Sequence, residues 1–278
     1  MSFTTFSTVK NGPVLTVRLD NGETNVMSAT MASELFALVG QLAVDGETRV
    51  VVFESAIPDF FIAHFQVADI LRLLEDDPDV PVSKVPGINV LQALGLSLQS
   101  LPQVTMAKVD GRCRGGGFEF MLALDMCFAT DESRFCFPEA ACGFLPSGGG
   151  ATLLPLKAGS GRALEIMTTG RDFSGTEASQ YGFINRSFAS ATELDQYVAT
   201  TAHQVGKRDL AVIQAIKSVS KATMAPLKDG LLAGLATENE AMVACLSVPA
   251  VQEGLRKLSA SEGTRDAELD LLALVETF

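Results

Sequence analysis

The sequence is poor in the side chains that bind metal ions and nucleic acids. Of its 278 residues only two are histidines, His64 and His203, and its five cysteines form no CxxC pair. A zinc site would lack ligands, so we expect no metal and reduced, buried thiols. The net charge is −12 and no basic cluster is visible. Because nucleic-acid binding depends on a basic surface, we expect no such partner and interpret the acidity as a contribution to solubility.

Long hydrophobic runs are also missing. The longest are about half of the ~20 residues that a membrane-spanning helix needs. The first twelve residues, MSFTTFSTVKNG, lack the basic segment and the apolar core of a secretion signal. Neither a Walker A motif nor a GxGxxG at a strand-to-helix turn is present. We therefore expect a cytoplasmic protein with no membrane partner and no nucleotide-binding loop of these two kinds.

The residues that are present can build a large core. Apolar side chains make up 47% of the chain and charged ones 19%, which is typical of a globular protein. Asn11-Gly12 predicts a hairpin turn, and Ser28 is a good N-cap for a helix that reaches about Val44. Strands are expected at 3–9, 13–19, 48–55, 104–111, 126–130, 134–138 and 183–188. Helices are expected at 66–74, 88–101, 115–125, 147–157 and 162–169, and a short one, capped by Thr176, is expected to end at Tyr181-Gly182. Residues 75–87, rich in Asp and Pro, predict a loop.

The strand pattern stops after about residue 190. Helices are then expected at 192–206, 209–223, 227–246 and 249–260, followed by an amphipathic stretch at 266–278. The fold class is therefore α/β with layered strands and helices, followed by an all-helical region. We place the division at residues 1–200 and 201–278. Apolar faces on such a tail usually pack against the same domain or against a neighbouring subunit.

Two glycine clusters and two carboxylates lie within Asp110–Gly150. Gly115–Gly117 follows a predicted strand and opens a predicted helix, so free backbone N–H groups gather there and stabilise negative charge. Amides placed in this way can form an oxyanion hole. The alternative is a tight turn that lets strand and helix pack closely. The second cluster, Gly148–Gly150, also precedes a helix and could present amides or be a plain turn.

Glu119 and Glu139 both lie among apolar residues. Apolar surroundings raise the pKa of a carboxyl group, which suits general acid–base catalysis. Two carboxyl groups with different pKa values can divide a reaction, one taking a proton and the other giving one. The alternative is that Glu119 only stabilises the helix dipole and that Glu139 is a solvated turn residue.

These motifs resemble the crotonase superfamily of enoyl-CoA hydratases and isomerases. The similar patterns are D-G-x-x-x-G-G-G-x-E at 110–119 and F-x-x-P-E-x-x-x-G at 135–143, with further similarity at 19–28, 60–70 and 161–186. The resemblance implies a spiral of ββα repeats and a C-terminal helical region that forms a homotrimer or hexamer. It implies a CoA or carrier-protein thioester as part of the substrate and no separate cofactor.

The resemblance also assigns roles. The amides of Phe65 and Gly116 would hold the thioester carbonyl, and Glu119 and Glu139 would bracket a water molecule. It thus implies syn addition of water to a 2-enoyl thioester, or the reverse. Double-bond isomerisation, C–C hydrolysis, decarboxylation and a non-catalytic scaffold role remain alternatives. Substrate contacts are expected from Ala63, His64, Gln66, Ile70, Arg114, Leu145 and Ser147, with an acyl pocket near Phe60, Phe61, Phe118 and Leu145.

Three positions depart from the family pattern. His64 stands where the family usually has glycine, and Gln66 where it usually has aspartate. His64 could be a third catalytic group or a hydrogen-bonded loop residue. Arg114 replaces an apolar residue and could pair with an acid or reach a substrate carboxylate. The basic residues that usually anchor CoA phosphates are also few, which leaves CoA and a carrier protein both open.

Overall fold

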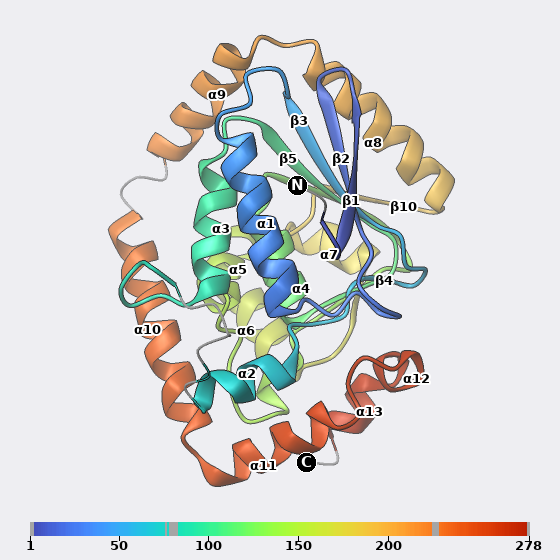
Figure 1. Ribbon diagram of the computed structural model, residues 1–278. Helices are drawn as coiled ribbons and strands as arrows, with labels where there is room; N and C mark the ends of the chain where they lie inside the picture. Colours follow the sequence, from blue (N-terminus) through green and yellow to red (C-terminus); the bar gives the residue numbers. More distant parts are fainter. Residues whose placement is uncertain (1–2, 76, 78–82, 224–227, 277–278) are drawn as a thin grey trace.

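The first sheet is built from a hairpin and four further strands that pair in parallel. In the computed structural model, which describes residues 3–75, 77, 83–223 and 228–276, β1 (Phe6–Asn11) pairs antiparallel with β2 (Val14–Leu19). The order in this six-stranded sheet is β1-β2-β3-β5-β7-β10, and every neighbour after β1 is parallel (Figure 1). The added strands are β3 (Val50–Ser55), β5 (Val104–Val109), β7 (Met126–Thr130) and β10 (Arg186–Phe188).

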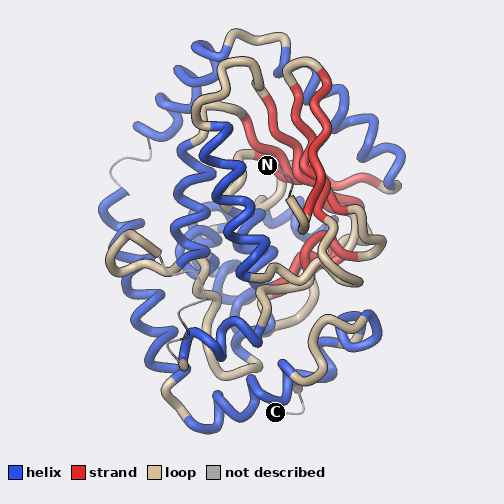
Figure 2. Tube along the Cα trace, viewed as in Figure 1, coloured by secondary structure: helices blue, strands red, loops and turns tan. Residues whose placement is uncertain are grey.

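A second sheet contains β8, which was expected at 134–138, and three short strands that the sequence did not show. Its order is β4-β6-β8-β9, and it lies beside the lower end of the first sheet (Figure 2). The strands are β4 (Phe60–Ile62), β6 (Arg112–Arg114), β8 (Arg134–Cys136) and β9 (Phe173–Ser174). The chain passes from one sheet to the other three times, from β3 to β4, β5 to β6 and β7 to β8. Each pass is followed by a helix, so the predicted spiral of ββα repeats is confirmed.

Helices fill the layer beside the first sheet. They include α1 (Ala29–Leu42), α2 (Val67–Leu74), α3 (Val90–Ser100), α4 (Gly115–Leu122), α5 (Gly150–Ala158), α6 (Ser160–Thr169) and α7 (Gly175–Tyr181). Ser28 caps α1 as predicted, and Asn89 forms a capping box with Gln92 at the start of α3. The cap of α7 is Ser174, because its hydroxyl accepts from the Glu177 amide; the expectation of Thr176 was wrong.

The first sheet is buried on both faces. Val51 and Phe53 of β3 point into the main core with α1, α3 and α4, whereas Val50 and Val52 pack on the other face. That second face is covered by α8 (Ala191–Gly206), which contacts the central strands. Burial on both faces explains why β3 is a continuous β-branched run rather than an alternating one.

The C-terminal helices pack back on their own chain. They are α9 (Leu210–Thr223), α10 (Lys228–Leu246), α11 (Pro249–Ser259), α12 (Arg265–Leu269) and α13 (Leu271–Val275). Contacts join α10 to α5 and α11 to α2, and Figure 1 shows α10 to α13 wrapping the left and lower sides. In the described part of the amphipathic stretch, residues 266–276, α12 and α13 follow one another as two short helices. Of the predicted loop at 75–87, residues 76 and 78–82 lie outside the described residues, and the others form no helix or strand.

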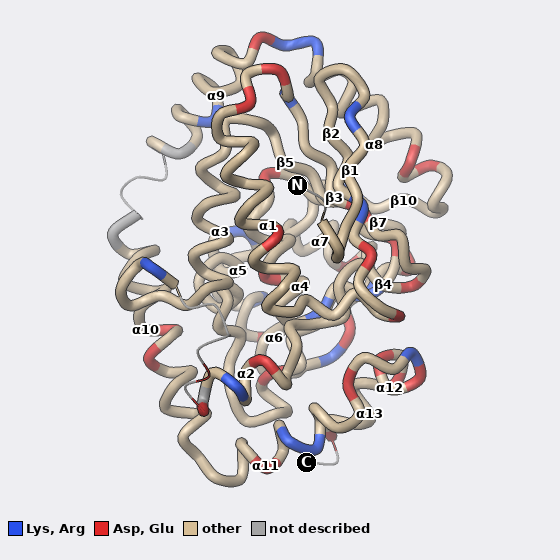
Figure 3. Tube along the Cα trace, in the orientation of Figure 1, with Lys and Arg blue, Asp and Glu red and all other residues tan. Residues whose placement is uncertain are grey.

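Among the described residues, no single helix has the length and apolar character to cross a membrane. The pair Gly230–Leu246 and Pro249–Ser261 meets that test only when combined, and its two helices are bent by 89°. All five cysteines are free; four are buried and Cys245 is partly exposed. Figure 3 shows Lys and Arg scattered along the chain among Asp and Glu rather than gathered on one element.

Candidate active site

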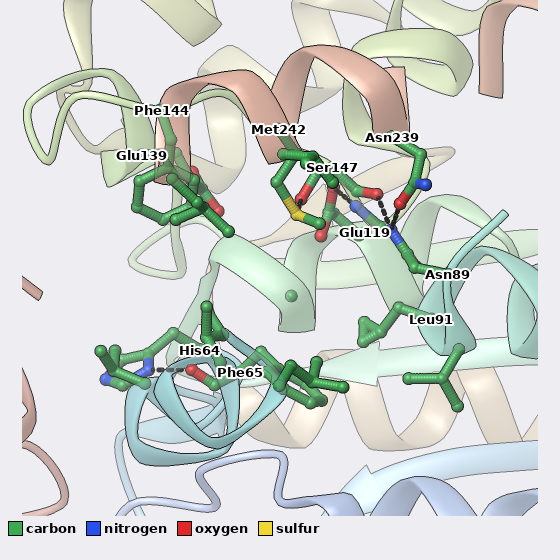
Figure 4. Close-up of a pocket in the computed structure, with 18 of the residues that line it drawn as sticks. His64, Phe65, Asn89, Leu91, Glu119, Glu139, Phe144, Ser147, Asn239 and Met242 are labelled. Atoms are coloured by element: carbon green, nitrogen blue, oxygen red, sulfur yellow. Dashed lines mark hydrogen bonds between the residues drawn. The ribbon is translucent and has the colours of Figure 1, made fainter. Parts of the chain in front are cut away.

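A cavity of about 400 Å³ lies between the glycine-triplet helix α4 and the C-terminal helices. Its lining comes from the loop before α2, from α2 and α3, from the start of α4, from residues 138–148 and from α10, α11 and α13. Most lining side chains are apolar. Within the part of the chain that the structure describes, the only ionisable side chains among them, apart from Cys142, are His64, Glu119 and Glu139. Figure 4 shows His64 and Phe65 on one side of this cavity and Glu119, Ser147 and Met242 on the opposite side.

Two backbone amides meet at the edge of this cavity. The bridge between Met27 and Phe65 uses the His64 carbonyl, 2.8 Å from the Met27 amide, and the Gln66 amide, 2.9 Å from the Met27 carbonyl. The Phe65 amide is therefore left out of that bridge. Gly116 is the second residue of α4, so its amide has no partner inside the helix. The structure thus brings together the two amides that were predicted from separate motifs.

The glycine triplet is needed for this close approach. A Cβ on Gly116 would lie 2.8 Å from the Phe65 Cβ and 3.1 Å from the Phe65 amide nitrogen. A Cβ on Gly117 would lie 2.6 Å from the Ile62 carbonyl oxygen. The distances of 2.8 Å at Gly116 and 2.6 Å at Gly117 are too short for a real Cβ atom. Any larger residue at either position would therefore push α4 away from the Phe65 loop. The triplet therefore serves close packing and amide placement together, and the two interpretations are not alternatives.

Glu119 is buried and held by the second glycine cluster. Its Oε1 accepts hydrogen bonds from the amides of Gly148, at 2.6 Å, and Gly150, at 2.9 Å. Burial raises the Glu119 pKa well above its ordinary value, and the nearby charges of Glu139 and Glu238 add to the effect. The two amides oppose this shift without cancelling it. The second cluster is thus a carboxylate-binding turn, although its role toward substrate stays a prediction.

Glu139 follows Pro138 in a single 3-10 turn and is also buried. Its Oε2 has no hydrogen-bond partner among the described residues. Burial raises the Glu139 pKa to about 8, although the positive charge of His64 counteracts part of that rise. A carboxyl group with a free oxygen and a pKa near neutrality can exchange a proton with a bound molecule. Glu139 is therefore not the solvated turn residue of the alternative interpretation.

Sequence reasoning missed Glu238 on α10. Its carboxylate accepts from the Gly149 amide at 2.6 Å and from the Thr152 hydroxyl at 2.7 Å, and the Gln92 side-chain amide lies 3.0 Å away. Three successive amides of the second glycine cluster are thus bound by two buried carboxylates, Glu119 and Glu238. Glu238 lies in a helix far from any motif, so only a pattern of buried charge could have indicated it.

His64 and Arg114 both form buried ion pairs. His64 Nε2 lies 2.8 Å from Oε1 of Glu268. Burial disfavours the charged imidazolium, but the negative charge of Glu268 outweighs that effect, so the His64 pKa rises to about 9. Arg114 makes a two-pronged pair with Asp172, at 2.9 and 2.5 Å. Arg114 does not line the cavity, so the structure supports pairing with an acid over contact with a substrate carboxylate.

The other predicted contacts divide into two groups. Ile70 and Ser147 line the cavity, as do His64 and Phe65. Ala63, Gln66 and Leu145 are not part of the lining. Gln66 instead precedes the first residue of α2, and Ala63 packs with Val26 and Phe60. The predicted acyl-pocket residues Phe60, Phe61 and Phe118 do not line the cavity. They are fully buried, because their large apolar rings pack in the hydrophobic core.

The spiral of ββα repeats, with two amides and two carboxyl groups at one cavity, defines the crotonase class. A family model described as enoyl-CoA hydratase/isomerase matches residues 9–260. A Streptomyces avermitilis structure named "putative enoyl-CoA hydratase" is 37% identical, with a TM-score of 0.88 over 99% of this chain and 98% of that one. The chain belongs to the enoyl-CoA hydratase/isomerase family.

Two further similarities are more distant. Carnitinyl-CoA dehydratase of Proteus mirabilis is 29% identical over 212 residues, which cover 76% of this chain and 78% of that protein. An enoyl-CoA hydratase from Bacillus halodurans superposes with a TM-score of 0.81 at 24% identity, over 92% of this chain and 100% of that one. The second likeness shows the fold alone.

Proposed function

We propose that this protein is a hydratase-type lyase that adds water syn across the double bond of a 2-enoyl thioester, or catalyses the reverse. The observation that supports this proposal most directly is that Glu119 and Glu139 face the same cavity as the Phe65 and Gly116 backbone. An isomerisation needs one group to carry a proton, whereas hydration uses two, one for water and one for carbon.

In the proposed reaction the thioester carbonyl accepts hydrogen bonds from the Phe65 and Gly116 amides. Water loses a proton to Glu139 as its oxygen bonds to C3, and the electron pair of the double bond moves toward the carbonyl. The resulting enolate is stabilised by the two amides, each contributing roughly 3 kcal/mol. Glu119 then gives its proton to C2, and the negative charge leaves the carbonyl oxygen.

The environments of the two carboxyl groups support this division of roles. Glu139 is near the cationic His64, which favours its ionised form, and one of its oxygens has no partner among the described residues. Glu119 faces two other carboxyl groups, Glu139 and Glu238, which favours its protonated form. An ionised base beside a protonated acid is the arrangement that hydration requires.

Loss of the absorbance of crotonyl-CoA tests this function. Glu139→Gln and Glu119→Gln should each lower kcat by about 10²- to 10⁴-fold, because each removes one proton-transfer step. Glu253→Gln, which changes an exposed glutamate on α11, is the matched control and should act like the wild type. Unchanged turnover in either catalytic variant would contradict a two-carboxyl hydration.

The lining of the cavity favours an apolar, uncharged acyl group. No Lys or Arg contributes to it within the described residues, so the phosphates of a CoA substrate would lie outside. The relative named carnitinyl-CoA dehydratase suggests a second candidate, since carnitine carries a quaternary ammonium group. Among the described lining residues, such a cation would find Glu139 and the rings of Phe65 and Phe144 as its main attractive partners.

Competition between substrates separates these options. Aliphatic 2-enoyl thioesters should show a higher kcat/KM than a carnitinyl thioester assayed in the dehydration direction. The same acyl group on CoA and on N-acetylcysteamine should give KM values that report how much the CoA phosphates contribute. If the protein converts a 3-enoyl thioester faster than it hydrates the 2-enoyl form, that result would favour isomerisation instead. We propose further that the protein acts as a homotrimer or hexamer, as its resemblance implies, and that it acts in the cytoplasm, as the features of its sequence suggest.

A further inference from the structure

The two unusual residues of the site, His64 and Arg114, are bound by the same distant residue. The carboxylate of Glu268 accepts from His64 Nε2 at 2.8 Å, and the backbone carbonyl of Glu268 accepts from Arg114 Nη1 at 2.7 Å. Glu268 lies on α12, 204 residues after His64 and 154 after Arg114. One residue of the C-terminal region thus connects two separate segments of the α/β region, the loop before α2 and the end of β6.

Those two segments lead directly to the two amides of the proposed oxyanion hole. His64 directly precedes Phe65, and Arg114 precedes Gly116 by two residues at the start of α4. We propose that Glu268 is a positioning residue that fixes the Phe65 and Gly116 amides relative to each other, through His64 on one side and Arg114 on the other. This inference rests on the proposed function only in requiring that a thioester carbonyl binds between the two amides.

The geometry requires His64 to donate from both ring nitrogens. Nδ1 lies 2.8 Å from the Phe65 carbonyl oxygen, which can only accept. Nε2 faces the Glu268 carboxylate, which also accepts when ionised. A ring with two donated protons is an imidazolium, so the contact with Glu268 is a charge-assisted hydrogen bond. The ring therefore holds both the Phe65 peptide and the tail, and turning it would break both bonds.

The Glu268 side chain has little freedom to move. It is 1% exposed, and Oε1 also accepts from the Gly263 amide at 3.0 Å. Its Oε2 is buried with no partner among the described residues, so the facing imidazolium is the main compensation for its charge. Removing either member of such a pair leaves a buried charge unpaired, which is strongly unfavourable.

Arg114 is fixed in the same way. Its Nε and Nη2 bind Asp172 in a two-pronged pair, which leaves Nη1 directed at the Glu268 carbonyl. Its side chain is 2% exposed. A planar guanidinium held at three points cannot shift without breaking several bonds, so the backbone of α12 is anchored beside the glycine triplet.

A second carboxylate of the tail supports the Phe65 loop from its other end. The Glu262 oxygens accept from the amides of Val67, at 2.7 Å, and Ala68, at 2.9 Å, which open α2. These amides would otherwise lack partners at the helix N-terminus. The loop that carries Phe65 is therefore held on both sides of that residue. Glu268 binds the side chain of His64, and Glu262 binds the amides of Val67 and Ala68.

The test measures polarisation of a bound carbonyl rather than hydration alone. A cinnamoyl-type CoA thioester is conjugated, so hydrogen bonds to its carbonyl shift its absorption band to the red and lower its C=O stretching frequency. Wild-type protein should show both shifts. Glu268→Gln removes the charge and keeps the shape, and should lose most of the shift while the Kd for the probe changes by less than about threefold. Its kcat should fall about 10- to 100-fold, the effect expected from a displacement of around 1 Å.

Asp266→Asn is the matched control, because Asp266 is an exposed carboxylate on the same helix. It should keep the full shift and the wild-type kcat. His64→Gln, which retains a donor toward Glu268, should behave like Glu268→Gln. It replaces Glu268→Gln in the test if that variant does not fold. In the double variant the losses should not add, because both changes break the same connection.

The outcomes separate this inference from the proposed function. A wild-type shift without hydration would contradict the hydratase function and leave the positioning role to be judged by the variants. A full shift and wild-type kcat in Glu268→Gln would overturn the positioning role. So would the absence of any shift in the wild type, since there would be no hole to position, even if hydration were observed.

Discussion

At the scale of single residues, the site is a set of buried carboxyl groups whose charges are unequally compensated. Glu268 faces a cation, Glu119 and Glu238 face backbone amides, and Glu139 keeps one oxygen without a partner among the described residues. Burial raises the pKa of Glu119, Glu139 and Glu238, whereas His64 outweighs burial and lowers that of Glu268. Glu268 therefore ionises at a lower pH than the other three groups.

The pH dependence of kcat/KM should follow the ionisation of Glu139. Burial raises its pKa to about 8, so Glu139 gains its basic form as the pH rises through about 8, and the Glu119 pKa is also raised well above its ordinary value. We expect kcat/KM to rise from pH 6 through about 8 and to fall only where Glu119 also ionises. Because the two groups interact, the limbs of a pH–rate profile report the pair.

The same profile should respond to His64. The charged groups near Glu139 are His64 from the loop before α2, Glu119 from α4 and Glu238 from α10. His64→Gln removes the only cation in this set, so the rising limb should move to higher pH. A limb that stays in place, or that moves to lower pH, would show that Glu139 does not control it.

His64 should remain protonated well above the pH at which a free imidazole loses its charge. Its pKa is raised from 6.5 to about 9, so the ion pair stabilises the fold fully below pH 6.5, and this contribution disappears as the pH rises through about 9. An NMR titration of the imidazole signals measures this, and the exposed His203 provides a second signal in the same sample. Glu268→Gln should lower the His64 midpoint by several tenths of a unit or more. An unchanged midpoint would contradict the pairing.

Much of this site could be predicted from the sequence because its central residues are close together in the chain. Gly116, Glu119 and Glu139 lie within 24 positions and occur at the family spacing. The partners of His64 and Arg114 could not be predicted, since Glu268 is separated from them by 204 and 154 residues. No local pattern links an isolated glutamate in an amphipathic tail to a loop that far away.

At the scale of elements, close approach between α4 and β4 decides where the amides lie. Strands of two or three residues, such as β4 and β9, give no alternation of apolar and polar side chains, so the second sheet was largely missed. Their pairing with distant strands, rather than local propensity, makes them strands. The longer elements were predicted more closely: β2, β3 and α1 lie within two residues of the expected bounds, whereas β1, expected at 3–9, runs from Phe6 to Asn11.

Gly117→Ala should test this packing. The added methyl group would lie 2.6 Å from the Ile62 backbone oxygen, which cannot move aside as a side chain can. We expect a loss of about 1–3 kcal/mol of stability and a lower Tm by thermal melting, together with reduced kcat. Gly40→Ala is the control, because Gly40 is on the exposed face of α1 with no atom within 4 Å of its added Cβ. It should be neutral or stabilising by up to about 1 kcal/mol. Equal melting temperatures for the two variants would contradict the close contact.

At the scale of the whole molecule, the C-terminal helices both close the cavity and leave apolar side chains outside. Leu258, Leu271 and Val275 line the cavity from α11 and α13. On α9, by contrast, Val212 is 51% exposed and Ile216 is 65% exposed, four residues apart on one face. The expected division at 200/201 remains a prediction, and so does the assembly of several chains.

The mass in solution should decide the assembly. If the apolar face of α9 is covered by another copy, light scattering should give three or six times the 29.4 kDa of one chain. Ile216→Glu should then lower the mass, because a charge at a covered apolar position cannot be solvated. Glu193→Gln, an exposed change on α8, should leave the mass unchanged. A single-chain mass for the wild type would contradict the expected trimer.

Since His64, Arg114 and Glu268 all belong to one chain, the positioning contacts should then persist in the monomer, and the carbonyl shift would still be observed.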